Sequence, residues 1–225
     1  MRMKGVSFYL SLCFFILLLN SVVLAHSAEV DVQDKASLQR GARLFMNYCS
    51  GCHSLNYLRY NHMAKGLGIT RFDGRINEDL LKNNLIFTQA TVNDPIRIAL
   101  PPEDAKQWFG IVPPDLSLVA REKGTEWLYS YLNGFYRDDA RPFGTNNRLV
   151  PGVAMPNILE TLNHELPKDQ FNNELHDLVS FLAYVGEPMQ SIRYRIGLYV
   201  VSFLFVLFLV VLGLKRVYWR KNGIK

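Results

Sequence analysis

Five consecutive residues, "CSGCH", constrain this chain more than any other feature. Cys49 and Cys52 are separated by two residues, and His53 directly follows the second cysteine. One helical turn places both thiols on one face, with the imidazole beside them. C-x-x-C-H is the attachment signature of c-type haem, in which two thioether bonds hold the porphyrin and the histidine lies under the iron. The pattern predicts one covalently bound haem c per chain.

Two other kinds of site also use closely spaced cysteines. A thioredoxin-like redox site needs a βαβ context, which this sequence lacks. A structural zinc site needs four ligands, typically from a second Cys or His pair. The third cysteine, Cys13, lies in the N-terminal apolar segment, and the other histidines form no such pair: His26, His62, His164 and His176. Haem attachment is therefore the favoured interpretation.

Both ends of the chain are apolar. Two basic residues precede the apolar run 8–19, and small residues follow it, which is typical of a secretory signal peptide. An uncleaved anchor is the alternative. Residues 196–214 contain no charged side chain, and about 20 apolar residues span a bilayer as a helix.

The basic residues around the second apolar run predict its orientation. Arg193 and Arg195 precede the run, and five basic residues follow it: Lys215, Arg216, Arg220, Lys221 and Lys225. The positive-inside rule places this basic end in the cytoplasm. The expected organisation has four parts: a signal peptide (1–25), an exported domain (26–190), a linker with a transmembrane anchor (191–214) and a cytoplasmic tail (215–225).

The net charge of +5 comes from the ends of the chain. Residues 26–190 hold 16 Lys and Arg against 20 Asp and Glu, a net charge of −4. The high isoelectric point thus reflects membrane topology and does not indicate nucleic-acid binding. If the acidic residues cluster in space, they would steer a basic partner in a salt-dependent way.

The second axial ligand of the iron is expected from a methionine. Met46 lies on the same predicted helix as the cysteines, Met63 follows the motif closely, and Met189 lies at the membrane boundary. Met155 lies in "LVPGVAMPN", whose prolines and glycine force an extended path that can carry a side chain to the iron. Core filling is the alternative role. His/Met ligation favours electron transfer over substrate binding.

Helical periodicity predicts helices over 37–50, capped by Ser37, and over 173–185, with Gly41 allowing the two to cross closely. A short helix is expected over 78–84. Two more are expected on either side of Gly124: one reaching Glu122, capped by Asp115 or Ser117, and one capped by Thr125 and closed by Gly134. The remaining sequence between residues 66 and 112 is rich in Gly and Pro and is expected to form loops.

Three motifs and the anchor together resemble the cytochrome c1 family, the haem subunits of ubiquinol–cytochrome c reductase, in a bacterial form. The motifs are "CSGCHS" (49–54), "PPDLS" (113–117) and "PGVAMP" (151–156). The resemblance implies a mainly α fold: an elaborated class I cytochrome c domain with long loops, plus one C-terminal transmembrane helix. Gly41 and Phe45 resemble the glycine–aromatic pair of its helix crossing.

The resemblance also assigns roles to individual residues. It implies that Cys49 and Cys52 form the thioethers and that His53 and Met155 bind the iron. The remaining haem contacts that it implies are Pro113 and Pro114 as a wall of the pocket, Arg121 as the partner of a propionate, and Trp127 where the family often has a tyrosine.

The implied function is electron transfer in the bacterial inner membrane, with the haem domain in the periplasm. The haem would take an electron from the Rieske iron–sulfur subunit and pass it to a c-type cytochrome, expected to be basic. The anchor would lie in the lipid bilayer and pack against the cytochrome b subunit. Two alternatives are a haem subunit of a terminal oxidase and a free-standing electron shuttle. A haem sensor or peroxidase-like enzyme would instead require an open sixth position on the iron.

Overall fold

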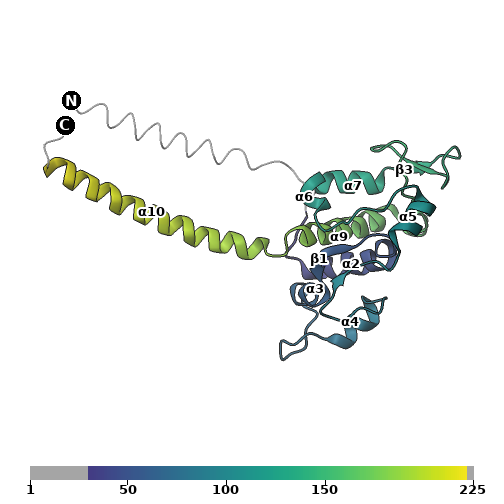
Figure 1. Ribbon diagram of the computed structural model, residues 1–225, viewed down its shortest axis with the longest axis horizontal. Helices are drawn as coiled ribbons and strands as arrows, with labels where there is room; N and C mark the ends of the chain where they lie inside the picture. Colours follow the sequence, from purple (N-terminus) through teal and green to yellow (C-terminus); the bar gives the residue numbers. More distant parts are fainter. Residues whose placement is uncertain (1–29, 222–225) are drawn as a thin grey trace.

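Two helices far apart in the sequence, α2 (Lys35–Leu44) and α9 (Lys168–Gly186), pack side by side at the centre of the folded domain (Figure 1). The computed structural model describes residues 30–221, so the predicted signal peptide lies outside the described residues. A Cβ atom on Gly41 would lie 2.0 Å from the carbonyl oxygen of Asp177. The predicted close crossing at Gly41 is therefore confirmed.

The crossing is reinforced on both sides of Gly41. The rings of Phe45 and Phe181 lie with their centroids 5.8 Å apart. Arg40 forms a bidentate ion pair with Asp177, with Nη2 3.0 Å from Oδ1. The aromatic contact and the ion pair fix the register of the two helices, which is what the family resemblance implied for the glycine–aromatic pair.

The beginning of α2 differs from the prediction. Asp34, not Ser37, is the N-cap, and its carboxylate accepts a hydrogen bond of 2.9 Å from the backbone N–H of Ala36. Ser37 is buried within the helix. The end of the predicted helix is a π-helical turn, η1 (Phe45–Cys49). Such turns are frequent at functional sites, and this one leads directly into the cysteine motif.

The helix α4 (Glu78–Asn84) has the predicted bounds. The cap of α6 (Val119–Lys123) is Leu118, so the predicted caps were wrong, and α7 (Thr125–Asn133) is capped by Gly124 one residue before Thr125. α9 begins five residues earlier than predicted. Three further helices are α3 (Tyr60–Leu67), α5 (Pro102–Phe109) and α8 (Glu160–Glu165), none of which the sequence pattern indicated.

Two small antiparallel sheets hold the loops. In the first, β1 (Leu55–Arg59) pairs with β2 (Pro95–Ile96), with Leu55 opposite Ile96. In the second, β3 (Phe135–Arg137) pairs with β4 (Thr145–Asn147), with Phe135 opposite Asn147. The first follows the cysteine motif and the second precedes the Met155 loop, so each sheet positions part of the candidate site.

The hydrophobic core forms where α2, α3 and α9 meet. Its largest fully buried side chains include Leu38, Phe45, Met63, Leu178 and Phe181. Each such side chain contributes roughly 1.5–3 kcal/mol on burial. Met46 and Met63 are 3% and 0% exposed, so both fill the core.

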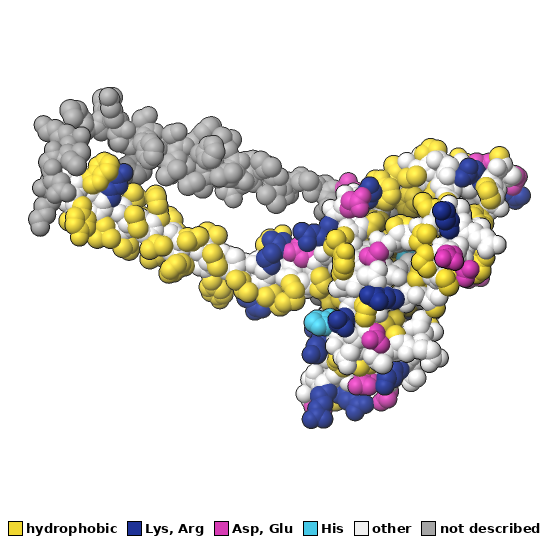
Figure 2. All heavy atoms as spheres, in the orientation of Figure 1, with side chains coloured by type: hydrophobic (Ala, Val, Ile, Leu, Met, Phe, Trp, Pro, Cys, Tyr) yellow, Lys and Arg dark blue, Asp and Glu magenta, His cyan; other side chains and the backbone are white. Residues whose placement is uncertain are grey.

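The last helix, α10 (Gln190–Lys221), leaves the folded domain and extends away from it (Figure 1). Residues 192–219 form a candidate membrane span, and its most apolar 18-residue window is not buried against the described structure. Figure 2 shows apolar side chains along its whole length. A helix of this length and exposure fits a membrane anchor. It is longer than the expected 191–214 segment and continues into the predicted tail.

Candidate haem-binding site

The cysteine motif forms a tight turn at the end of η1. The backbone N–H groups of Cys52 and His53 both donate to the carbonyl oxygen of Cys49, at 3.0 and 2.9 Å. Both cysteines are free thiols. Burial raises the pKa of Cys49 to about 12 and also raises the pKa of Cys52. The thiols are therefore protonated at neutral pH and held beside the imidazole.

The "PPDLS" segment runs alongside the residues that follow the motif. The N–H of Leu116 donates to the carbonyl of Ser54 at 2.9 Å, and the N–H of Asn56 donates to Asp115 Oδ2 at 2.8 Å. The other carboxylate oxygen of Asp115 accepts from the N–H of Ser117 at 2.9 Å. Asp115, expected as a possible helix cap, instead joins the two segments.

This pairing places His53 against a backbone carbonyl. Its Nδ1 atom lies 2.7 Å from the carbonyl oxygen of Pro114. Because a carbonyl can only accept a hydrogen bond, Nδ1 carries the proton and Nε2 keeps its lone pair. Burial lowers the pKa of His53, so the neutral imidazole is favoured. A neutral imidazole fixed through one nitrogen is typical of a metal ligand.

Met155 lies beside an aromatic group from α7. The Tyr131 hydroxyl donates to Met155 Sδ at 3.5 Å, and burial raises the pKa of Tyr131 to about 12, so the hydroxyl remains a donor. Trp127 stacks on Tyr131 with centroids 4.9 Å apart, and Phe135 meets the same ring edge-on at 5.4 Å. The tyrosine beside the methionine is thus Tyr131, and Trp127 supports its ring.

Polar side chains of β4 hold the Met155 loop. Asn146 Oδ1 accepts from the N–H of Gly152 at 2.8 Å, and Thr145 Oγ1 accepts from the N–H of Asn157 at 3.3 Å. Asn147, which is fully buried, accepts from two further N–H groups of the loop. None of these three residues was predicted from the sequence. The signal was the polar run 145–147 just before the loop, since buried amides need partners.

Arg141 holds the same loop from the other side. Its Nη2 donates to the carbonyls of Gly152 and Val153, at 2.7 and 3.2 Å. Arg141 and β4 together therefore hydrogen-bond the backbone of the residues that precede Met155. The loop therefore presents its methionine from a braced backbone.

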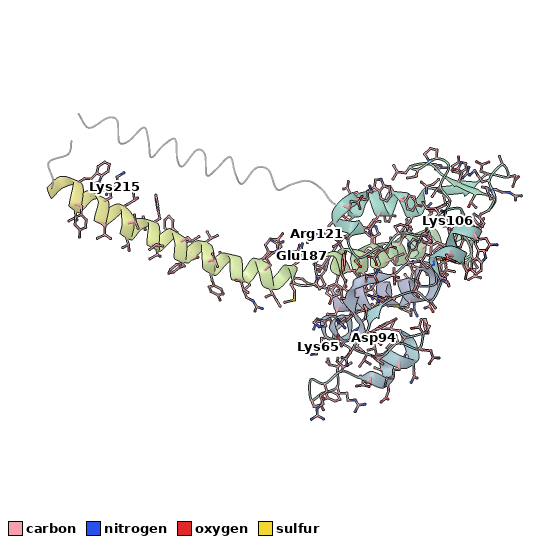
Figure 3. All side chains as sticks on the ribbon, in the orientation of Figure 1. Lys65, Asp94, Lys106, Arg121, Glu187 and Lys215 are labelled. Carbon is pink, nitrogen blue, oxygen red and sulfur yellow. The ribbon has the colours of Figure 1, made fainter. Side chains whose placement is uncertain are left out.

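Arg121, on α6, packs against the end of α9. A Cβ atom on Gly186 would lie 3.1 Å from Arg121 Cγ. Figure 3 places Arg121 near Glu187, at the root of α10. The pKa of Glu187 is lowered, first by a hydrogen bond from Arg193 and also by the charge of Arg121. The structure thus brings His53 against Pro114, and it places Met155 and Trp127 on the same tyrosine, Tyr131. The role of Arg121 toward a propionate stays a prediction.

The donor set fits a covalently bound haem. Two free thiols, one imidazole with an available Nε2 and one thioether in a braced loop are the groups that c-type haem requires. Within residues 30–221, no group of three or more His, Cys, Asp or Glu could hold a metal ion directly.

The helical fold, the cysteine–histidine turn, the methionine loop and the apolar C-terminal helix define a class of protein: the membrane-anchored c-type cytochromes. The model of the Cytochrome C1 family matches residues 24–222, nearly the whole chain, and the chain belongs to this family. Family membership implies a haem cofactor and an electron-transfer role.

Relatives from two bacteria align over most of this chain. "Cytochrome c1" of Allochromatium vinosum is 42% identical, over 94% of this chain and 98% of that protein. "Ammonia monooxygenase gamma subunit" of Nitrosomonas europaea is 36% identical, over 86% of each chain. A solved chain described as "Hyperthermophilic respiratory Complex III" covers 97% of both chains at 20% identity. The TM-score of that comparison is 0.45.

Proposed function

We propose that this chain is the haem subunit of a quinol–cytochrome c oxidoreductase, the cytochrome bc1 complex. One haem c is attached through Cys49 and Cys52, and its iron is bound by His53 and Met155. The observation that carries this proposal is the hydrogen bond from His53 to the Pro114 carbonyl, because it leaves Nε2 available beside the two thiols.

When bound, the haem supplies one-electron redox chemistry. Residues of this chain would hold the haem and tune the reduction potential of its iron. Pro114 fixes the imidazole plane, and the two cysteines prevent dissociation of the porphyrin. The Tyr131 hydroxyl withdraws electron density from the sulfur of Met155, which favours the reduced iron. With His53 and Met155 both bound to the iron, no position would be left for a substrate, so the chain would act as an electron carrier.

The proposed electron route begins at a Rieske iron–sulfur subunit and ends at a soluble or anchored c-type cytochrome. The net charge of −4 over residues 26–190 supports a basic acceptor. α10 would cross the inner membrane and pack against a cytochrome b subunit, with the haem domain in the periplasm and the basic tail in the cytoplasm. The name of the Allochromatium relative, "Cytochrome c1", supports the proposal that this chain is the haem subunit of such a complex.

The test is a reduced-minus-oxidised visible spectrum of the tagged full chain, purified in mild detergent from its native membrane. We expect a c-type band together with b-type bands from the partner subunit. A Cys49→Ser/Cys52→Ser variant, purified in the same way, should lack the c-type band. A parent chain without a c-type band would contradict the haem assignment.

The same preparation tests the complex. The name of the Nitrosomonas relative points to an ammonia-oxidising enzyme as the other possible assembly. Mass spectrometry of the co-purified subunits distinguishes the two: the proposal requires a cytochrome b and a Rieske protein. Monooxygenase subunits in their place, or a c-type band without any b-type band, would contradict the bc1 assignment while leaving the haem assignment intact.

A further inference from the structure

A pocket of about 500 Å³ lies at the junction between the folded domain and α10. Its walls come from the start of α2, from α3 and from the segment that joins α9 to α10. We define this junction pocket by five of its lining residues: Lys35, His62, Lys65, Tyr184 and Met189. It shares none of the residues assigned to the haem, so it needs a separate explanation.

The junction pocket is basic. Lys35 and Lys65 are exposed, and within the described part of the chain neither forms an ion pair. His62 also lines the pocket and adds an imidazole to the two ammonium groups. The one carboxylate among the lining residues that the structure describes, Glu187, is already held by Arg193 through two hydrogen bonds, one of 3.1 Å. The two lysines are therefore left to bind an anion.

Tyr184 brings a hydrogen-bond donor to the same pocket. Its side chain is 6% exposed, and a Cβ atom on Gly66 would lie 1.8 Å from its hydroxyl oxygen, so the ring fits closely over that glycine. Its hydroxyl makes no hydrogen bond to any other described residue. Burial raises the pKa of Tyr184 to about 12, which keeps the proton on the oxygen. The hydroxyl oxygen is not among the buried polar atoms that lack a partner, so it is accessible to solvent and can donate to a ligand in the pocket.

The position of the pocket relative to the membrane indicates where such a ligand comes from. The candidate span begins at residue 192, three residues after Met189. Figure 2 shows Lys, Arg and His side chains gathered around the root of α10, and Figure 3 places Lys65 on that side of the domain. Phospholipid headgroups occupy this level of a bilayer, and anionic headgroups attract such basic side chains.

We propose that the junction pocket binds the headgroup of one anionic phospholipid from the leaflet next to the folded domain. Lys35 and Lys65 pair with its phosphate oxygens, and the Tyr184 hydroxyl donates to one of them. Val32 and Met189, which also line the pocket, contact the apolar part of the lipid next to the headgroup. Free inorganic phosphate offers the same oxygens but lacks this apolar part.

The experiment is native mass spectrometry of the full haem-loaded chain, delipidated in a neutral detergent and titrated with phosphatidylglycerol or phosphatidylcholine. We expect one phosphatidylglycerol retained per chain. The Lys35→Gln/Lys65→Gln variant should bind it about tenfold or more weakly, because two cations at the headgroup are lost. A matched control, Lys106→Gln/Lys168→Gln, removes the same charge far from the pocket and should bind like the parent.

The other outcomes contradict the proposal. Equal loss in both double variants would mean a general charge effect, and equal retention of phosphatidylcholine would mean no preference for an anionic lipid. Displacement of the lipid by low millimolar inorganic phosphate would mean a free-anion site.

Tyr184→Phe keeps the packing against Gly66 and should still weaken binding about threefold, because one hydrogen bond is lost. An unchanged visible spectrum shows that each variant is folded.

Discussion

At the scale of single residues, the proposed site depends on how its two predicted iron ligands, His53 and Met155, are held. His53 is fixed by the carbonyl of Pro114 at 2.7 Å. Met155 is held by the Tyr131 hydroxyl and by a loop that β4 braces. The two predicted ligands therefore differ in their support, because His53 is held by a backbone carbonyl and Met155 by side chains.

Replacing Met155 with alanine should open the sixth position of the iron. We expect the reduction potential to fall by roughly a tenth of a volt or more, since axial ligands set haem potentials over about 0.8 V. The reduced protein should then bind carbon monoxide, which a visible spectrum records. Met189→Ala, at an exposed position, is the control and should leave both properties unchanged. A Met155→Ala spectrum identical to that of the parent would rule out this ligand.

Tyr131→Phe removes the hydroxyl donor and keeps the ring. Without the hydrogen bond, the sulfur of Met155 donates more strongly and stabilises oxidised iron, so we expect a potential lower by some tens of millivolts. A redox titration measures it. Tyr129→Phe is the matched control, because Tyr129 stacks on His176 instead, with centroids 4.5 Å apart. The same shift in both variants would indicate a general effect of losing a hydroxyl.

At the scale of elements, the crossing of α2 and α9 fixes the position of the cysteine motif. η1 continues directly from α2, so any displacement of α2 from α9 moves Cys49. The crossing depends on the absence of a side chain at Gly41, where the backbone of α9 comes closest.

Gly41→Ala should therefore destabilise the domain despite the higher helix propensity of alanine. The added methyl group would meet the Asp177 carbonyl at 2.0 Å, and overpacking of this kind typically costs about 1–3 kcal/mol. Denaturant unfolding followed by circular dichroism measures the loss. Gly51→Ala is the control, because nothing lies within 4 Å of its Cβ position. Equal stability of both variants would contradict the close crossing.

At the scale of the whole molecule, burial of two tyrosines couples stability to alkaline pH. The pKa values of Tyr131 and Tyr184 are raised from 10.0 to about 12 by burial. Both phenols are protonated in both states below pH 10. Above it, the unfolded chain releases these protons while the folded chain retains them, so stability is complete below about pH 10 and falls as the pH rises toward 12.

The expected result is a denaturant midpoint that decreases between pH 9 and pH 11.5. In a Tyr131→Phe/Tyr184→Phe variant the decrease should be smaller, because neither ring can ionise. Tyr57→Phe/Tyr194→Phe, at two exposed positions, is the matched control and should behave like the parent. Identical pH profiles for all three proteins would contradict the role of burial.

The charge of the folded domain predicts salt-dependent electron transfer. A basic c-type cytochrome should be reduced more slowly as ionic strength rises, because the Debye length shortens to about 10 Å at 0.1 M salt. Stopped-flow kinetics measures the rate. Reduction of an acidic c-type cytochrome should show the opposite slope. A rate for the basic acceptor that does not change with salt would remove the electrostatic argument for that partner.

Features that depend on local chemistry were predictable from the amino-acid sequence. The spacing of Cys49, Cys52 and His53 lies within one turn, and the apolar run that forms α10 is continuous, so both can be read without the fold. The Gly41 crossing was predictable for a similar reason, because a small residue on an apolar helix face marks a close approach.

The distant groups that support the site are brought together by the fold and could not be predicted from the sequence. His53 and Pro114 are 61 residues apart, and Tyr131 and Met155 are 24 apart. Helical or strand periodicity acts over a few residues and says nothing about such pairs. For this reason the sequence did not predict the contact of Arg121 with Gly186 or the hydrogen bonds from β4 to the Met155 loop. These contacts form only when the loops fold back onto the domain, so no local sequence pattern encodes them.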